Sequence, residues 1–360
     1  MMRRTGGGLV SYACFLLLST TLSACGYFHH DVRSYIEEPF PKKLSQWHLF
    51  TASRHGLKPN QRVVPYDLNT PLFSDYASKY RFVWMPPDTS AVYREDGPFE
   101  FPVGTILSKS FGFPIDVHPG QEKLIETRLL VKTKSGWTPL PYVWNEDQSE
   151  ATLQYVPDPV EVKWTNVSGH HYDFSYHIPN TNECRQCHDN LRELKPIGLK
   201  ARNLNKNYPY ADGTMNQIAY WTRIGYLRDT PQLDSVPRVA KWDDPATGSV
   251  ADRARAYLDN NCAHCHQPGG SAGYSGVDFR YTQTEMDRMG FCKSPASAGN
   301  VRRLLYDMVP GDPAASIVVY RMKSTEPKVM MPQYGRTLVH QEGVSLIEDW
   351  IASLPQQSCP

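Results

Sequence analysis

Two copies of the pattern Cys-x-x-Cys-His constrain this chain more than any other feature. Each copy has two thiols and an imidazole in the same order: Cys184, Cys187, His188 and Cys262, Cys265, His266. Thiols three positions apart lie on one side of a helical turn, where they can bond the two vinyl groups of one haem while the adjacent imidazole ligates its iron. The sequence therefore predicts two covalently attached haems c.

Structural zinc is the alternative for such cysteine pairs, because two pairs could complete a cage of four thiolates. Three observations favour haem. A histidine directly follows each pair, the pairs are 78 positions apart (Cys184 to Cys262), and the N-terminus has the features of a secretion signal. Export takes a chain to the compartment where c-type haem is attached.

Residues 1–24 are typical of a lipoprotein signal peptide. Two arginines precede an apolar run over residues 9–18, which is too short to span a membrane. The run ends in Leu22-Ser23-Ala24-Cys25, which resembles the lipobox of bacterial lipoproteins. This resemblance implies that Cys25 is acylated. The glycine after it resembles sorting signals for the outer membrane, so we expect an exported protein that is lipid-anchored there and faces the periplasm.

The remaining cysteines predict one disulfide. Cys14 lies in the signal peptide, Cys25 ends it, and four cysteines belong to the two motifs, which leaves Cys292 and Cys359. In an oxidising compartment, a leftover pair most simply forms a disulfide.

Composition indicates a folded protein of short elements. Apolar residues make up 40% of the 360 positions, and 29 prolines and 24 glycines predict many turns. The formal net charge is +1, and removing residues 1–24 deletes two arginines and no acid, which leaves 36 − 37, or −1. No global field attracts nucleic acid.

The pattern of apolar residues divides the chain. Residues 46–180 contain short β-branched and aromatic runs, such as 80–84 and 126–132, separated by turn residues, which predicts an antiparallel β domain. Near the C-terminus, Ser249 is a candidate N-cap for a helix that ends at the second motif, and a second apolar stripe predicts a closing helix. We expect a signal peptide (1–24), a tether (25–45), the β domain (46–180), a first haem-attachment segment (181–245) and a second haem domain (246–360).

The last segment resembles a small class I cytochrome c, with a helix leading into the haem motif, a Met-Pro pair and a closing helix. This resemblance implies a thioether as the second axial ligand of its iron. Met331 precedes Pro332 and is the preferred candidate, with the adjacent Met330 as the alternative. The predicted fold class is α+β multidomain, with an N-terminal antiparallel β domain followed by a mainly α-helical cytochrome c-like haem domain.

The sixth ligand of the first iron is left open by the sequence. Candidates in this part of the chain are His170, His171, His177 and Met215, and no spacing rule selects one. An iron with an open coordination position is a further option.

The chain also resembles a family of bacterial lipoprotein diheme c-type cytochromes. Long stretches carry this resemblance: residues 65–76, 101–105, 125–130, 142–145, 200–205, 261–268, 309–313 and 320–335. A weaker resemblance relates the β domain to the cytochrome P460 arrangement, in which a haem with an open position sits on a β-sheet. That arrangement implies that Lys109 lies near the first haem.

Together these features favour an electron carrier over a catalyst. We expect a membrane-anchored diheme cytochrome that passes electrons between a periplasmic dehydrogenase or another cytochrome and a downstream acceptor. One alternative is a haem enzyme acting on peroxide or a small nitrogen compound at an open first iron. Another is a binding lipoprotein in which the haems are secondary.

Overall fold

The computed structural model describes residues 1–2, 30–51, 57–115, 120–166, 168–297 and 301–360. Residues 32–360 form one compact unit, and residues 1–31 form another. Cys25 and nearly all of the predicted signal peptide lie outside the described residues. None of the helices in the described ranges is long and apolar enough to cross a bilayer.

The compact unit is built around a six-stranded antiparallel sheet, whose strands follow one another from edge to edge in sequence order. The strands are β3 (Val64–Tyr66), β4 (Ser78–Trp84), β6 (Ile106–Pro114), β7 (Glu122–Thr133), β8 (Gly136–Trp144) and β9 (Ala151–Leu153). Short strand pairs surround it: β1 (Phe50–Thr51) with β2 (Lys58–Pro59), β5 (Ala91–Val92) with β16 (Leu227–Arg228), β10 (Val160–Thr165) with β11 (His171–Tyr176), β12 (Asp189–Asn190) with β13 (Glu193–Leu194), and β14 (Asn207–Tyr210) with β15 (Gly213–Asn216).

The two faces of the large sheet are covered by different parts of the chain. Side chains alternate along β4, so Phe82 and Trp84 belong to one core cluster and Val83 to another. The first cluster includes Trp47 from the segment before the sheet. The second includes Trp221 from a helix that follows the first motif. The sheet is therefore buried on both faces along this part of its length.

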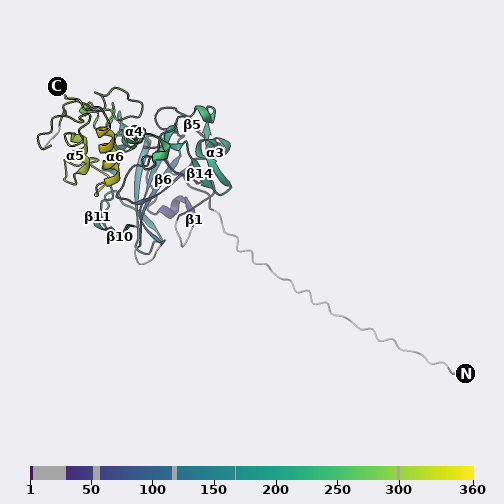
Figure 1. The fold of residues 1–360 in the computed structure, drawn as a ribbon. Coiled ribbons are helices and arrows are strands. Elements are labelled where there is room, and N and C mark those ends of the chain that lie inside the picture. Colours follow the sequence, from purple (N-terminus) through teal and green to yellow (C-terminus); the bar gives the residue numbers. More distant parts are fainter. Residues whose placement is uncertain (3–29, 52–56, 116–119, 167, 298–300) are drawn as a thin grey trace. The chain divides into compact units, whose positions relative to one another are not determined.

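In the described part of the chain, the α-helices are short and all lie after the sheet in the sequence. They are α1 (Thr181–His188), α2 (Ala201–Leu204), α3 (Gln217–Arg223), α4 (Val250–Asn261), α5 (Ile317–Lys323) and α6 (Gln341–Ala352). Helices α4, α5 and α6 gather at one end of the compact unit, whereas α3 lies with β5 and β14 at the other (Figure 1). Leu258, Val319 and Ile347, one from each of the three C-terminal helices, belong to the same core cluster.

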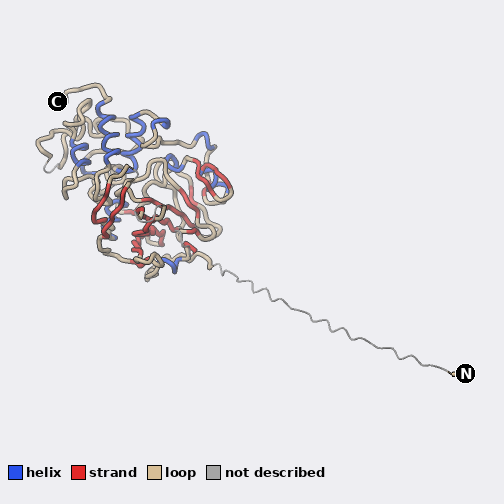
Figure 2. The backbone as a smooth tube through the Cα atoms, turned by 60° about the horizontal axis from the view of Figure 1, so that its bottom comes forward, coloured by secondary structure: helices blue, strands red, loops and turns tan. Residues whose placement is uncertain are grey.

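The predicted fold class is wrong in its description of the C-terminal haem domain. Helices α4, α5 and α6 contain 12, 7 and 12 residues, so most of residues 246–360 is not helical. Figure 2 shows long loops between these helices. The described residues between α4 and α5 contain only a short 3-10 helix, η4 (Gly273–Ser275). Residues 262–316 are rich in Gly, Pro and Ser, which favour turns over helices, and the two predicted helices do not extend into them.

A buried carboxylate connects the β-rich part of the chain to the C-terminal part. Asp75, just before β4, accepts hydrogen bonds from the backbone N–H groups of Thr337 and Leu338, each at 2.7 Å from Oδ1. Asp75 is 1% exposed and has a left-handed backbone conformation, with φ of 51°. These bonds hold the loop before α6 against the end of the sheet.

Candidate functional site

Helix α1 presents the first motif. Its N-cap is Asn180, whose side chain accepts hydrogen bonds from the backbone N–H groups of residues 182 and 183, and the Glu183 side chain accepts from the N-cap N–H in return. This capping box fixes the start of a helix of only eight residues. As a result Cys184 and Cys187 lie one turn apart, and His188 is the last helical residue.

The His188 imidazole is held in the tautomer that can ligate a metal through Nε2. Its Nδ1 lies 2.7 Å from the carbonyl oxygen of Lys195. A carbonyl only accepts, so Nδ1 carries the proton and Nε2 keeps its lone pair. Burial lowers the pKa of His188 to about 4, which keeps the ring neutral.

The second motif follows α4 directly. Cys262 is the C-cap of α4, and its carbonyl accepts hydrogen bonds from the N–H groups of Cys265 and His266. The His266 Nδ1 lies 3.2 Å from the Ser275 hydroxyl oxygen, so Nδ1 is the hydrogen-bonded ring nitrogen here as well; a hydroxyl can accept the Nδ1 proton when Nε2 ligates a metal. Burial lowers the pKa of His266 to about 4.

The two motifs meet in space. A ring nitrogen of His264 and the sulfurs of Cys187 and Cys265 all lie within 4.8 Å of one another. The backbone agrees with this proximity, because Asn190 and Gly270 form an isolated antiparallel β-bridge. The sequence did not predict this contact.

This arrangement is not the four-thiolate zinc cage considered from the sequence. A tetrahedral site needs all four sulfurs around one point. Within the described ranges, the ligand group contains Cys187 and Cys265 but neither Cys184 nor Cys262. One cysteine of each pair therefore lies outside the shared contact.

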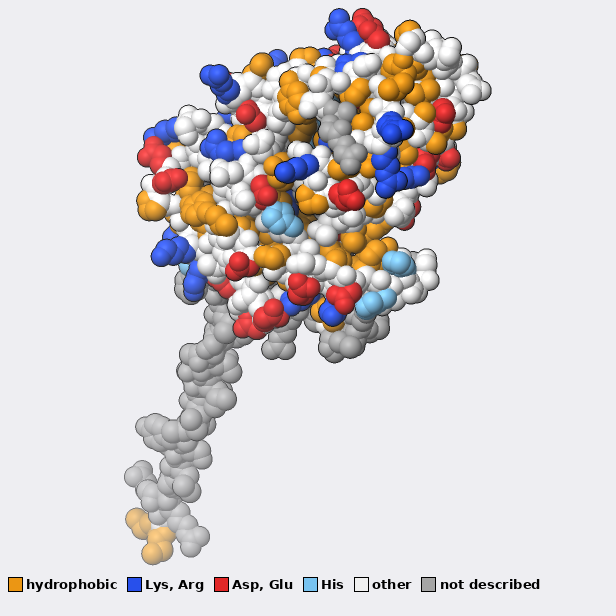
Figure 3. Space-filling view, turned by 90° about the vertical axis from the view of Figure 1, so that its left-hand side faces the viewer, with side chains coloured by type: hydrophobic (Ala, Val, Ile, Leu, Met, Phe, Trp, Pro, Cys, Tyr) orange, Lys and Arg blue, Asp and Glu red, His pale blue; other side chains and the backbone are white. Residues whose placement is uncertain are grey.

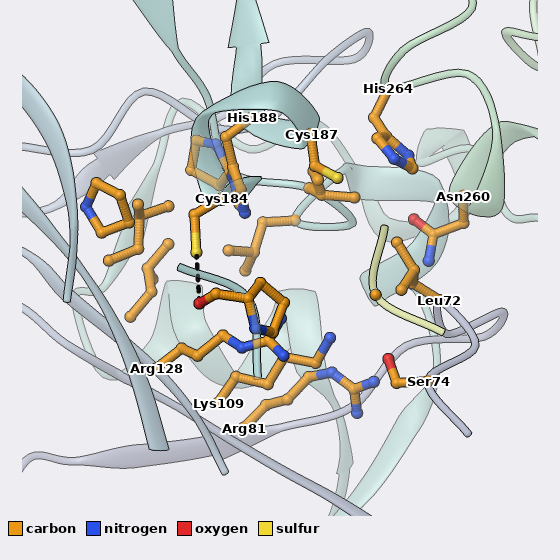
Figure 4. A pocket seen from close by; sticks show the side chains of 18 of the residues that line it. Leu72, Ser74, Arg81, Lys109, Arg128, Cys184, Cys187, His188, Asn260 and His264 are labelled. Carbon is orange, nitrogen blue, oxygen red and sulfur yellow. Dashed lines mark hydrogen bonds between the residues drawn. The ribbon is translucent and has the colours of Figure 1, made fainter. Parts of the chain in front are cut away.

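A cavity lies between α1 and the large sheet (Figure 4). It encloses about 1160 Å³ of space free of protein atoms, part of it open to solvent. On one side are the first-motif residues Cys184, Cys187 and His188, and on the other are three cations from the sheet. The cations are Arg81 of β4, Lys109 of β6 and Arg128 of β7, and apolar side chains complete the wall: Leu68, Leu72, Leu107, Leu130, Ile197 and Leu199.

The residues of this cavity fit a haem. The thiols of α1 suit its vinyl groups, the free Nε2 of His188 suits its iron, the leucines suit its apolar ring, and the cations suit its two carboxylates. Covalent attachment needs Cys184 and Cys187 as unpaired thiols, and both are outside any disulfide.

None of the sequence candidates for the sixth ligand of the first iron lines this cavity. His170 precedes β11 and His171 is its first residue, and both are exposed. His177 Nε2 bonds the Glu183 carboxylate at 2.8 Å. Met215 packs against the core cluster beneath α3. On the sheet wall the structure instead brings Lys109 into the cavity, together with two arginines that sequence reasoning missed. The sequence carries no clear signal for the arginines, because β4 and β7 contain several other charged and polar residues.

The two methionines considered for the second iron lie in the loop before α6. Met331 donates its backbone N–H to the carbonyl of Arg321 and accepts at its own carbonyl from the Arg336 guanidinium. The positive charge of Arg321 in turn contributes to the lowered pKa of His266, after burial and the nearby His264. The assignment of Met331, with Met330 as the alternative, stays a prediction.

Cys292 and Cys359 form a disulfide, with their Cα atoms 5.0 Å apart. The bridge joins residues with a sequence separation of 67 and closes a segment that contains α5 and α6. It ties the C-terminus to the loop that follows the second motif.

Comparisons with protein families, with curated proteins and with solved structures find no match to this chain. Acidic and basic side chains are interspersed on the face seen in Figure 3, in keeping with the small net charge.

Proposed function

We propose that this protein is a diheme c-type cytochrome that transfers electrons between a periplasmic dehydrogenase or another cytochrome and a downstream acceptor. In this proposal it belongs with the bacterial lipoprotein diheme cytochromes, is exported, and is anchored through Cys25 to the outer membrane facing the periplasm. Cys184 and Cys187 hold one haem, and Cys262 and Cys265 hold the other.

The observation that carries the proposal is the shared environment of the two motif histidines. In both motifs the Nδ1 atom faces an internal oxygen, the Lys195 carbonyl at 2.7 Å and the Ser275 hydroxyl at 3.2 Å. Metal-ligating histidines characteristically use the second ring nitrogen in this way, because the hydrogen bond fixes the ring orientation and increases the basicity of the ligand.

The contact between the motifs supports electron transfer in particular. When bound, each haem supplies a one-electron Fe(III)/Fe(II) couple. The chain contributes the attachment points, and those at Cys187 and Cys265 are side by side. Haems bonded to adjacent sulfurs would be attached at neighbouring points, which favours exchange of electrons within the protein.

A second candidate function is catalysis on a small substrate, peroxide or a nitrogen compound, at an open first iron. The composition of the first cavity favours it. The described lining residues include no methionine, and the sheet wall opposite α1 carries cations; besides His188, the lining histidine is His264 of the second motif.

The test is to quantify covalent haem in protein produced with a c-type haem attachment system. We expect two haems per chain in the natural protein and one in each of the double variants Cys184→Ala/Cys187→Ala and Cys262→Ala/Cys265→Ala. The matched control is Cys292→Ala/Cys359→Ala, which removes two cysteines outside the motifs and should keep both haems. A protein that binds zinc and no haem would contradict the proposal.

Carbon monoxide separates the two candidate functions. An unchanged spectrum of the ferrous protein indicates that both irons are fully ligated and supports the carrier. Gas binding that disappears in Cys184→Ala/Cys187→Ala and persists in Cys262→Ala/Cys265→Ala assigns an open position to the first iron and supports catalysis.

A further inference from the structure

Three cations form a ladder across the wall of the first cavity. Lys109 on β6 lies directly opposite Arg81 on β4 and directly opposite Arg128 on β7. Like charges in directly opposed positions of a sheet repel each other, and the repulsion grows where burial lowers the dielectric constant. A ladder of this kind, with Arg81 buried and Lys109 and Arg128 half-buried, needs a reason.

The protein neutralises only part of this charge. Asp67 bonds Arg81 at 3.1 Å, but it also bonds Lys206 at 2.6 Å. Glu126 is fully buried and forms a two-bond pair with Arg128. Two carboxylates therefore face three ladder cations and a further lysine.

The ladder also has unused hydrogen-bond donors. The Arg81 side chain is 5% exposed, and its Nη2 atom is buried without a hydrogen-bond partner. Lys109 has neither an ion pair nor a hydrogen bond within the part of the chain that the structure describes; its ammonium lies 4.7 Å from the centre of the Phe111 ring. Both side chains line the cavity.

Burial lowers the pKa of Lys109 well below its usual value, and the charges of Arg81, Lys79 and Arg128 lower it further, against an opposing effect of Glu126. An anion in the cavity would raise the pKa of Lys109 again, because it would compensate the positive charges and accept hydrogen bonds from the unused donors. Bonds of this kind to charged partners contribute about 1.5–3 kcal/mol each.

We propose that Arg81 and Lys109, assisted by Arg128, form a binding site for a carboxylate or small inorganic oxyanion in the cavity beside the first motif. Two sources share this chemistry: the carboxylates of a haem held by Cys184 and Cys187, or a free oxyanion that binds next to the iron. The identity of the occupant rests on the proposed function, whereas the site itself rests on the ladder.

The test compares Lys109→Met with Lys109→Arg, which keeps the charge, and with Lys123→Met as the matched control. Lys123 lies on β7 in the same sheet, pairs with the exposed Glu146 and does not line the cavity. The probe is sodium nitrite, a small oxyanion that also ligates ferric haem. It is titrated into the oxidised full-length protein while the Soret band is followed.

One outcome is a saturable response to nitrite whose affinity falls about tenfold or more in Lys109→Met but is retained in Lys109→Arg and Lys123→Met. This outcome supports a site for a free oxyanion. A tenfold change corresponds to about 1.4 kcal/mol. If nitrite has no effect, the first haem is measured alone in the Cys262→Ala/Cys265→Ala background. A lower reduction potential in Lys109→Met, restored in Lys109→Arg, then supports a site for the haem carboxylates, because losing a positive charge favours Fe(III).

Equal behaviour of Lys109→Met and Lys123→Met in both measurements overturns the proposed site. If the purified chain carries no haem, the proposed function fails and the site is tested separately by thermal unfolding. Nitrite should then raise the melting temperature above that in equimolar chloride for the natural protein but not for Lys109→Met, because a ligand stabilises the state that binds it. If nitrite changes the melting temperatures of the natural protein and Lys109→Met equally, the proposed site is overturned.

Discussion

The sulfur atoms of Cys187 and Cys265 lie within 4.8 Å of each other, although the two residues are 78 positions apart in the sequence. Each belongs to a different Cys-x-x-Cys-His motif. Their contact brings helix α1 beside the turn that follows α4, and it makes the two proposed attachment sites parts of one centre.

The proposed ligand of the proposed second iron is tested by Met331→Ala. We expect the second haem to stay attached and its reduction potential to fall, because a soft sulfur ligand favours Fe(II). The fall should be a measurable part of the roughly 0.8 V that axial ligands span. Potentiometric titration of Met331→Ala beside Met330→Ala decides between the neighbours. An unchanged potential in Met331→Ala would show that this residue is not the ligand.

If the second motif holds a haem as proposed, the hydrogen bond to His266 should tune the potential of its iron. The Ser275 hydroxyl oxygen is 3.2 Å from Nδ1, and a partner at this position increases the basicity of the imidazole. A more basic ligand favours Fe(III), so Ser275→Ala should raise the potential of the second haem. Ser353→Ala, which removes a hydroxyl bonded to the Trp350 carbonyl after α6, is the control. If Ser275→Ala has the same reduction potential as Ser353→Ala, Ser275 does not tune this iron.

The buried Asp75 carboxylate should be important for stability. Replacing it by alanine leaves the N–H groups of Thr337 and Leu338 without their acceptor. We expect Asp75→Ala to lower the free energy of unfolding by about 2–3 kcal/mol. Urea unfolding measures this, with Asp88→Ala as control, because Asp88 has a similar left-handed φ of 58° and is exposed. Equal losses in the two variants would assign the effect to backbone conformation rather than to the hydrogen bonds.

Removing the disulfide should destabilise the C-terminal part. The Cys292–Cys359 bridge closes a loop with a sequence separation of 67 residues, so Cys292→Ala/Cys359→Ala should cost about 2–4 kcal/mol through the greater freedom of the unfolded chain. Unfolding with and without a reductant checks this prediction. The natural protein should lose stability in reductant, and the variant should be insensitive to it.

Stability should fall between about pH 6.5 and pH 4, partly because of His340. Burial lowers the pKa of His340 to about 4 from its usual 6.5, while Glu342 opposes the shift. Its ring stacks on Phe73 with the centroids 4.1 Å apart, and its Nδ1 is 2.9 Å from the Tyr257 hydroxyl.

In this pH range the unfolded chain binds a proton that the folded protein excludes, so acidification favours unfolding, by up to roughly 1.4 kcal/mol per pH unit for one group. His340→Gln should show a shallower dependence of the unfolding free energy on pH. An identical slope in the variant would mean that His340 is not the group that titrates.

Local sequence determined several parts of the fold. Ser249 is the N-cap of α4, as predicted, because its hydroxyl accepts from the Asp252 N–H, and α4 ends at the second motif. The closing apolar stripe lies on α6. Both features depend on side chains a few positions apart, which is the range over which helix caps and apolar periodicity act.

The other features of the fold depend on contacts between distant segments, and local sequence patterns do not predict such contacts. The register that sets Lys109 opposite Arg81 and Arg128 depends on how three strands align, and a shift of one residue would turn the lysine to the other face. The mainly α-helical description failed because loops, rather than further helices, connect α4, α5 and α6.

The sequence by itself determined the make-up of each motif, because two thiols and an imidazole at fixed spacing are a property of five consecutive residues. Only the tertiary structure decided that Cys187 meets Cys265 and that three cations face the first motif across one cavity. Such contacts depend on the packing of segments that are distant along the chain, and no local pattern of residues encodes that packing.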